Sequence, residues 1–452
     1  MLAVLISTYE MGRQPFGLAS PAAWLRAAGW YVECRDLAKQ QLPEDLTATA
    51  DLVAFYLPMH TASRLAAPVI ERVREINPSA SICAYGLYAP LNADRLRSLG
   101  VDVVFGGEFE ADLTDLARSL ATTDRLESDF RQSRETSPVP RLRFLIPDRT
   151  GLPPLDRYAT LQMPGGDRKL VGYTEASRGC KHLCRHCPIV PVYNGQFRTV
   201  AVNVVLADIV AQVGAGARHI TFGDPDFLNG PTHALRVVDA LHDAHPEVTY
   251  DVTIKIEHLL RYRSLLPRLR DTGCLFVTSA VESVDDRVLA LLDKGHTRRD
   301  LFEAAWLCRD TGVTLVPTFV AFHPWITLEG YCDLLDTVDE LDLVEHVAPI
   351  QLAIRLLIPQ GSRLLQTDEI RSLVGPFDPV TLTYRWSHVD RRVDALQQEV
   401  STIVGMKLTV GRRQLFDEIS ELAHTRAGVR RVSSRPARDR ATVPYLNEPW
   451  YC

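Results

Sequence analysis

The stretch Cys180-Lys181-His182-Leu183-Cys184-Arg185-His186-Cys187 places three of the chain's nine cysteines within eight residues. The remaining cysteines are scattered singly along the chain. Small secreted proteins instead distribute their cysteines as disulfide pairs through a much shorter sequence, whereas a tight group in a long chain is typical of metal binding. We therefore expect a metal centre at this stretch.

The spacing of these cysteines narrows the kind of metal centre. Three thiolates can hold one face of a cubane iron–sulfur cluster and leave one iron without a protein ligand, whereas ferredoxin patterns supply four cysteines. Zinc is the alternative, because zinc prefers four ligands and His182 or His186 could supply the fourth. The sequence favours the open cluster and leaves zinc as the second interpretation.

The cysteine stretch lies near the start of a regular alternation that runs over residues 170–355. Short apolar runs alternate there with segments of helical periodicity, which predicts parallel βαβ units. Six such units predict a partial or full parallel barrel, with its functional residues at the carboxyl ends of the strands. The expected strands cover residues 171–175, 219–222, 250–255, 274–279, 314–319 and 350–354.

Residues 1–120 show the same alternation and predict a separate doubly wound, Rossmann-like α/β domain. Gly86, Pro90, Gly106 and Gly107 follow strand ends, where such folds bind ligands. The loop with Glu10 and Arg13 could instead reach the substrate. The expected strands cover residues 2–7, 30–34, 52–56, 81–85 and 101–105, and one clear amphipathic helix covers residues 62–76.

The two remaining segments are less regular. Residues 121–169 are rich in Arg, Ser, Thr and Pro and predict a linker, because the prolines prevent a continuous helix. Residues 356–452 form a C-terminal region with helical patterns over 391–403 and 413–425. The predicted fold is thus α/β: a Rossmann-like domain, a partial (β/α)6 barrel and an irregular, partly helical C-terminal region.

Composition excludes several classes of protein. Apolar residues make up 46% of the chain and charged residues 23%, which is ordinary globular composition. The net charge of −6 argues against nucleic acid as a partner. No apolar run reaches the roughly 18 residues of a membrane span, and the short apolar run at residues 1–7 lacks the basic start of a signal peptide. We expect a cytoplasmic protein without a membrane partner.

The cysteine stretch and its flanks resemble radical S-adenosylmethionine (SAM) enzymes. Ser177-Arg178-Gly179 before the first cysteine, and Pro188 and Asn194-Gly195-Gln196-Phe197-Arg198 after the third, resemble members with an N-terminal cobalamin-binding-type domain. The resemblance implies that Cys180, Cys184 and Cys187 hold a 4Fe–4S cluster. The open iron would then bind the amino and carboxylate groups of S-adenosylmethionine.

The resemblance also implies roles for residues at later strand ends. Asp224 or Asp226 would accept a hydrogen bond from the amino group of S-adenosylmethionine, although Asp226 could simply cap a helix. Lys255 and Glu257 are candidate catalytic residues, with surface solvation as the alternative. The other expected cofactor-binding residues are Glu282, His186, which stands where the family often has an aromatic residue, and Arg198.

The ligand of the N-terminal domain stays open. The resemblance implies cobalamin, but the Asp-x-His-x-x-Gly motif that supplies an axial histidine in many cobalamin proteins is absent. Either cobalamin binds without that histidine or the domain binds none, and the sequence leans toward the second interpretation. The tail ending in Cys452 resembles those of radical enzymes with cysteine near the C-terminus, and a role for Cys452 also stays open.

The resemblance implies a reaction that begins with reductive cleavage of S-adenosylmethionine to a 5′-deoxyadenosyl radical. That radical would abstract hydrogen from a small polar metabolite, and an electron donor such as flavodoxin or ferredoxin would reduce the cluster. The preferred outcome is dehydration of an aminoglycoside or sugar diol in antibiotic biosynthesis. The alternatives are cobalamin-dependent C-methylation, aminocarboxypropyl transfer, and an iron–sulfur sensor or scaffold without enzymatic activity.

Overall fold

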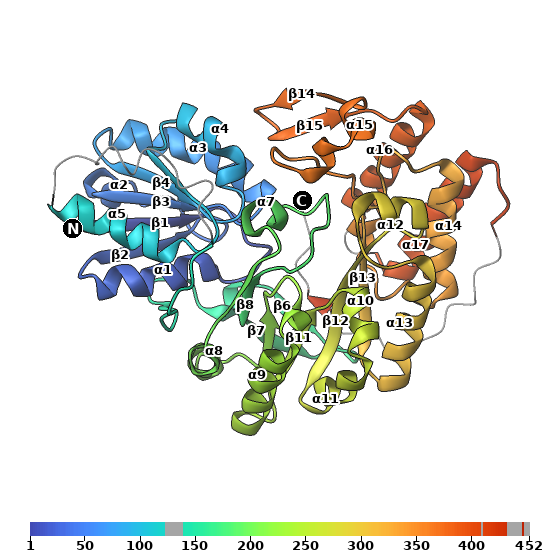
Figure 1. Cartoon of the computed structure of the whole chain (residues 1–452), viewed down its shortest axis with the longest axis horizontal. Helices are drawn as coiled ribbons and strands as arrows, with labels where there is room; N and C mark the ends of the chain where they lie inside the picture. Colours follow the sequence, from blue (N-terminus) through green and yellow to red (C-terminus); the bar gives the residue numbers. More distant parts are fainter. Residues whose placement is uncertain (123–138, 408–409, 432–444, 447–452) are drawn as a thin grey trace.

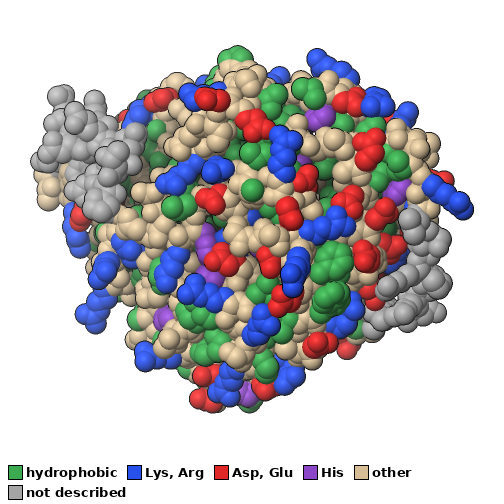
Figure 2. Space-filling model, turned by 45° about the vertical axis from the view of Figure 1, so that its right-hand side comes forward, with side chains coloured by type: hydrophobic (Ala, Val, Ile, Leu, Met, Phe, Trp, Pro, Cys, Tyr) green, Lys and Arg blue, Asp and Glu red, His purple; other side chains and the backbone are tan. Residues whose placement is uncertain are grey.

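The computed structural model describes residues 1–122, 139–407, 410–431 and 445–446. Figure 1 shows an N-terminal α/β part in blue, a central sheet with its helices in green and yellow, and a mixed C-terminal part in orange. No described helix is both long and apolar enough to cross a membrane. On the face shown in Figure 2, acidic and basic side chains are interspersed.

The N-terminal part is a doubly wound parallel sheet with the strand order β2-β1-β3-β4-β5. Alternate residues of β1 enter opposite cores, Val4 and Ile6 on one face and Ala3 and Leu5 on the other. Helices therefore cover both faces, and the predicted Rossmann-like fold is confirmed. The strands are β1 (Leu2–Ser7), β2 (Tyr31–Asp36), β3 (Leu52–Tyr56), β4 (Ser81–Tyr85) and β5 (Val103–Phe105), and the helices are α1 (Phe16–Ala27), α2 (Glu44–Thr49), α3 (His60–Ile76), α4 (Ala93–Ser98) and α5 (Glu110–Thr122).

The central part is a curled half-barrel, as the sequence predicts. Five parallel strands lie in the order β13-β12-β11-β10-β7, and an antiparallel edge of β6 and β16 follows β7. The strands are β6 (Thr160–Gln162), β7 (Arg168–Thr174), β10 (His219–Phe222), β11 (Thr249–Thr253), β12 (Cys274–Glu282), β13 (Thr314–Phe319) and β16 (Tyr445–Leu446). The helices are α8 (Val202–Gly214), α9 (Pro231–Ala244), α10 (Ile256–Arg261), α11 (Leu266–Asp271), α12 (Asp286–Leu292), α13 (Arg298–Thr311) and α14 (Leu328–Glu340).

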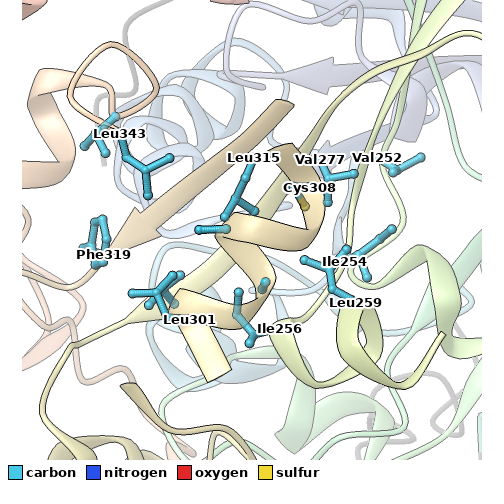
Figure 3. Packing of buried hydrophobic residues seen from close by; sticks show 14 of the residues in the cluster. Val252, Ile254, Ile256, Leu259, Val277, Leu301, Cys308, Leu315, Phe319 and Leu343 are labelled. Carbon is cyan, nitrogen blue, oxygen red and sulfur yellow. The ribbon is translucent and has the colours of Figure 1, made fainter. Parts of the chain in front are cut away.

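The half-barrel is held by one apolar core between its strands and helices. Figure 3 shows Val252, Val277 and Leu315 from the strands together with Leu301 and Cys308 from α13. All of these side chains are buried in one cluster. At roughly 1.5–3 kcal/mol for each fully buried large apolar side chain, this core is the main stabilising contribution to the half-barrel.

The predicted strand over residues 350–354 is wrong. Pro349–Leu352 instead form a 3-10 helix, and Pro349 suits its first turn, where the missing amide hydrogen is not needed. Side chains contact β13 on this side instead of a sixth strand: Gln351 Oε1 accepts a hydrogen bond from the Phe319 amide at 3.0 Å, and His346 Nδ1 lies 2.6 Å from the Leu315 carbonyl oxygen. Only an isolated bridge between Phe322 and Arg355 continues the parallel pairing. The barrel thus has five parallel strands rather than six.

Two smaller expectations also change. The helix expected after β11 is divided into α10 and α11 by a 3-10 turn over Arg263–Leu265, and Pro267 lies in the first turn of α11, where a missing amide hydrogen costs nothing. Within the expected linker, β6 adds a strand to the sheet. The domain boundaries themselves stay a prediction.

The C-terminal part covers one side of the half-barrel. The helix α17 packs against α14, and Leu415, Phe416 and Ile419 of α17 belong to the same core as the barrel. The hairpin of β14 and β15 lies above it (Figure 1). The elements are α15 (Asp368–Arg371), β14 (Val374–Asp378), β15 (Thr383–Trp386), α16 (Arg391–Met406) and α17 (Arg412–Ala427).

Candidate iron–sulfur and cofactor site

The cysteine stretch forms a loop at the carboxyl end of β7. The short strand β8 (Ser177–Gly179) leads into it, α7 (Ile189–Tyr193) follows it, and β9 (Phe197–Thr199) returns to pair antiparallel with β8. Gly179 has a φ of +75°, and a Cβ there would lie 2.4 Å from the Tyr193 ring. Only glycine permits the chain to approach Tyr193 this closely, so Gly179 allows the two ends of the loop to lie side by side.

The three thiols form a donor set that suits a positively charged metal centre. Cys180 and Cys184 are buried, and none of the three is in a disulfide. Burial raises the pKa of the Cys180 thiol and raises that of Cys187 to about 12. Metal ligation requires thiolates, so a metal centre would supply the charge that these buried sulfurs need. The Lys255 ammonium lies 3.8 Å from Cys184 Sγ and adds a positive charge beside the loop.

Glu282 and His186, both expected near the cofactor, are brought together. The Glu282 carboxylate lies 3.1 Å from His186 Nε2 and 3.2 Å from the Lys294 ammonium. Burial alone would raise the pKa of Glu282, but Lys294 and His186 together hold it down to about 2. Glu282 also has a φ of +70°, a strained conformation for a residue with a side chain and one that is concentrated at functional sites.

Asp224 is placed differently from its expected role. Its Oδ2 accepts a hydrogen bond from the Ala176 amide at 2.9 Å, and its Oδ1 accepts one from the Ser177 hydroxyl at 2.5 Å. Burial raises the pKa of this carboxyl to about 7. Both oxygens of Asp224 therefore hold the entry to the cysteine loop, and we do not retain Asp224 as a contact of the S-adenosylmethionine amino group.

Arg198 also turns away from its expected cofactor role. Its guanidinium donates hydrogen bonds to the backbone carbonyls of Val139, Pro140 and Phe197 and to the Gln196 side chain. These partners belong to the expected linker and to the chain around β9. Arg198 therefore attaches the linker to the cysteine ribbon, because its donors are already used there.

Asp226, Lys255 and Glu257 converge beside the cysteine loop. Asp226 Oδ1 accepts from the Leu228 amide at 3.2 Å, as the helix-cap interpretation predicts, while Oδ2 lies 2.7 Å from His258 Nδ1. Glu257 Oε2 lies 3.6 Å from the Lys255 ammonium and 3.6 Å from His182 Nδ1. Lys255 and Glu257, the predicted catalytic pair, thus belong to a cluster of polar side chains that contacts the cysteine loop at His182.

A small polar cavity lies beyond the carboxyl ends of β12 and β13. Its volume is about 260 Å³, and Glu282, Asp285 and Asp333 contribute carboxylates to its wall. His323 and Trp325 also line it, and among the described residues neither His323 Nδ1 nor Trp325 Nε1 has a hydrogen-bond partner. Burial lowers the pKa of His323 to about 3, so its ring is neutral. Unpaired polar groups in a hollow are suited to bind a polar ligand.

Contact between the N-terminal domain and the cysteine loop is a feature that the sequence did not predict. Arg178, two residues before Cys180, lies 3.2 Å from Glu108, 2.7 Å from Glu110 and 2.6 Å from Glu175. The Arg178 side chain is 7% exposed and those of Glu108 and Glu110 are 0% exposed, so the ion pairs are buried. The charges themselves are visible in the sequence, but their pairing across about 70 residues depends on how the domains meet.

The expected ligand place of the N-terminal domain is filled by its own side chains. In this strand order, ligands bind at the carboxyl ends of β1 and β3. Tyr56 ends β3, and its ring lies over Gly17, where a Cβ would come within 2.1 Å of it, and 3.0 Å from the Cβ position of Gly86. Tyr85 and Phe109 pack against Tyr56 at centroid distances of 5.5 and 5.9 Å. In this conformation the glycines accommodate Tyr56, whose ring belongs to the apolar core shared by the sheet, α1 and α5.

Comparison with known proteins agrees with this geometry. Residues 174–341 match the model of the radical SAM superfamily. The chain is 24% identical over 258 residues to a tRNA-2-methylthio-N(6)-dimethylallyladenosine synthase of Methylococcus capsulatus, covering 53% of this chain and 50% of that protein. It is 26% identical over 190 residues to the synthase of the same name from Chlorobium phaeobacteroides, covering 39% of this chain and 41% of that protein. The chain thus spans about half the length of these relatives or less.

The solved structures that it resembles extend the likeness to the N-terminal part. The cobalamin-dependent radical enzyme OxsB superposes with a TM-score of 0.69 at 14% identity, covering 94% of this chain and 72% of OxsB. The methyltransferase TsrM of Kitasatospora setae gives a TM-score of 0.58 at 16% identity, covering 75% of this chain and 70% of TsrM. Residues 174–341 of the chain thus match the radical SAM superfamily, and the fold of the chain, including the α/β domain that precedes this segment, resembles that of OxsB.

Proposed function

We propose that this chain is a radical SAM enzyme that works without cobalamin on a small polar metabolite. Cys180, Cys184 and Cys187 would hold the 4Fe–4S cluster, and the open iron would bind S-adenosylmethionine. When bound and reduced, these groups supply the carbon-centred radical that removes hydrogen from the substrate. The observation that carries the cobalamin-free reaction is the Tyr56 ring over Gly17 and the end of β3.

The residues at the mouth of the half-barrel would position the substrate beside the cofactors. The ionised Glu282 lies at the edge of the polar cavity and is tied to the cysteine loop through His186. Asp285 gives the cavity an acidic group that favours a substrate with a protonated amine, whereas Asp333 is already paired with Arg298, which also lines the cavity. The small cavity volume favours a metabolite over the tRNA named for the sequence relatives. A ferredoxin or flavodoxin would deliver the electron.

Dehydration of a diol, as in aminoglycoside or sugar deoxygenation in antibiotic biosynthesis, is the outcome that we propose. Loss of hydrogen beside a hydroxyl gives a radical from which the neighbouring oxygen can leave as water. One electron from the ferredoxin or flavodoxin and one proton would then convert the resulting carbonyl-stabilised radical to the product, without a methyl donor. Such a reaction requires polar side chains around the substrate hydroxyls and exclusion of bulk water. The partly enclosed cavity with its unpaired His323 and Trp325 donors provides such surroundings.

Product analysis of S-adenosylmethionine turnover tests this proposal. Anaerobically reconstituted protein, given dithionite and a panel of amino sugars, should release 5′-deoxyadenosine and a product lighter than the substrate by one water. S-adenosylhomocysteine beside 5′-deoxyadenosine would instead indicate methyl transfer. Methylthioadenosine would indicate aminocarboxypropyl transfer. A reconstituted protein that binds its cluster but forms none of these products would leave the sensor or scaffold interpretation.

Cobalamin binding provides a second prediction. We expect the wild-type protein, expressed and reconstituted with hydroxocobalamin, to retain less than about 0.1 pigment molecules per chain after gel filtration, because Tyr56 occupies the ligand place. Absorbance of the desalted protein measures this. Retention of one cobalamin per chain would contradict the proposal and favour the methylation alternative. The variant Tyr56→Ala is an informative companion, since any cobalamin that it gains would identify Tyr56 as the obstacle.

A further inference from the structure

A second metal-ligand set lies beside the cysteine loop but uses none of its sulfurs. His182, Asp226 and His258 each direct one ligand atom into a common space, and these atoms all lie within 4.8 Å of one another. Asp226 Oδ2 is 2.7 Å from His258 Nδ1 and 3.4 Å from His182 Nε2. The three residues come from the cysteine loop, the loop after β10 and helix α10, so the tertiary fold brings them together.

The three convergent ligand atoms are buried and make no hydrogen bond to any other described group. Among the described residues, His182 Nε2, His258 Nδ1 and Asp226 Oδ2 all lack a hydrogen bond of acceptable geometry. The side chains of Asp226 and His258 are 0% and 6% exposed. A buried carboxylate oxygen and two buried ring nitrogens without hydrogen bonds are costly, and a shared cation would satisfy all three at once.

We propose that His182, Asp226 and His258 form a binding site for a divalent transition-metal ion of the zinc or ferrous type. Imidazole nitrogens and a carboxylate oxygen bind such ions at about 2.0–2.2 Å, which places neighbouring ligand atoms roughly 3–3.5 Å apart. The two separations from Asp226 Oδ2, 2.7 and 3.4 Å, lie within about half an ångström of this range, and the two ring nitrogens lie within 4.8 Å of each other. The donor set of two histidines and one carboxylate suits these borderline ions better than magnesium or calcium, which prefer oxygen.

The surroundings support the orientation of these ligands. The other oxygen of Asp226 accepts from the Leu228 amide, which fixes the carboxylate. The His258 ring packs against Tyr262 at 5.3 Å and against the His182 ring at 4.7 Å. Such outer contacts hold metal ligands in one orientation. Glu257 lies 3.6 Å from His182 Nδ1 and lines the exposed side of the site.

Three protein ligands leave coordination positions free. A hydroxyl or amine of a substrate at the barrel mouth could occupy such a position, as at catalytic sites that keep an open coordination place. The alternative is that the three side chains form only a hydrogen-bonded histidine–aspartate relay that steadies the cysteine loop. The two interpretations differ in metal content, which does not depend on the proposed function.

Metal analysis of the reconstituted holoprotein separates them. Tag-free protein with its cluster assembled is given one equivalent of Zn²⁺, gel-filtered without oxygen, and measured for zinc and iron by mass spectrometry. We expect about one zinc per chain beside about four irons. Asp226→Asn and His258→Gln should each reduce bound zinc at least tenfold while iron is unchanged. His233→Gln is the matched control, because His233 bonds the Ala176 carbonyl on the same face but lies outside the group.

X-ray absorption spectroscopy at the zinc edge, applied to the wild-type holoprotein, identifies the ligand atoms of zinc independently of any variant. Nitrogen and oxygen neighbours near 2.0–2.1 Å support the site, whereas a sulfur neighbour near 2.3 Å would assign the zinc to cysteine and overturn the proposal. Absence of zinc from the wild-type protein, or full zinc in both variants, would overturn it as well. The iron content reports separately whether the cluster proposal holds. If a variant loses iron and zinc together, the neighbour atoms seen in the wild-type spectrum decide whether zinc binds at this site.

Discussion

Cys184→Ala lowers the iron content of the reconstituted protein from about four atoms per chain to below about 0.5 and abolishes 5′-deoxyadenosine formation. This expected result follows from the proposed ligand set, in which three thiolates are the minimum that holds a cubane cluster. Cys184 is buried at the centre of the loop and beside the Lys255 ammonium, and alanine offers no ligand atom in its place. Iron and sulfide assays, together with the absorbance near 400 nm, measure the effect.

The matched control for this prediction is Cys332→Ala. Cys332 is also buried, but it lies in α14 within the apolar core and outside the cysteine loop. It should retain iron and turnover, with a loss of stability of about 1 kcal/mol from the missing sulfur. Full iron content in Cys184→Ala would disprove the ligand assignment. Zinc in place of iron in the wild-type protein, bound through sulfur, would favour the alternative metal.

Arg178→Met is expected to destabilise the folded chain by about 3–5 kcal/mol, because it leaves buried carboxylates without their shared cation. Glu108, Glu110 and Glu175 surround Arg178 at distances between 2.6 and 3.2 Å. Denaturant unfolding of the cluster-free protein measures this loss as a lower free energy of unfolding. The relevant transition is the one that separates the N-terminal domain from the half-barrel. The exposed pair of Arg72 and Glu44 provides the control, since Arg72→Ala should leave the free energy of unfolding close to that of the wild-type protein.

The loss in Arg178→Met should also depend on pH. Burial raises the pKa of Glu108 from 4.5 to about 7 even with Arg178 in place. The folded state therefore binds more protons than the unfolded state between these values, and the contribution of Glu108 to stability falls as pH rises through that range. The charge of Arg178 lowers the pKa of Glu108, so removing Arg178 should raise this pKa further. The variant should therefore lose more stability at pH 8 than at pH 5.

Rescue of Arg178→Met distinguishes unpaired charge from lost packing. Adding Glu108→Gln and Glu110→Gln removes two of the buried charges, and this triple variant should recover most of the lost stability and show little dependence on pH. An Arg178→Met variant that unfolds like the wild-type protein at pH 8 would disprove the role of these ion pairs. Equal destabilisation in the triple variant would assign the loss to packing against Phe16, Phe109 and Phe144 instead.

Local pattern in the sequence was sufficient for the parts of the fold that depend on neighbours along the chain. The five strands of the N-terminal sheet and the first five strands of the barrel follow from short apolar runs, since a buried parallel strand must be apolar on both faces. The cysteine loop follows from its spacing. The strand expected over residues 350–354 failed because an apolar run does not reveal which segment pairs with a sheet edge, and here the Gln351 side chain rather than a strand backbone accepts from the Phe319 amide.

The contacts between distant segments were decided only by the tertiary structure. The sequence contains Arg178, Glu108 and Glu110, and likewise His182, Asp226 and His258, but it does not say which charges face one another. It shows glycines at the carboxyl ends of the N-terminal strands but not that Tyr56 fills the space that they leave. The physical reason is that periodicity and spacing act within one element, whereas partner choice depends on how loops and domains close over many residues. The sequence by itself predicted the cysteine ligand set and determined the α/β fold, and the tertiary structure determined what surrounds them.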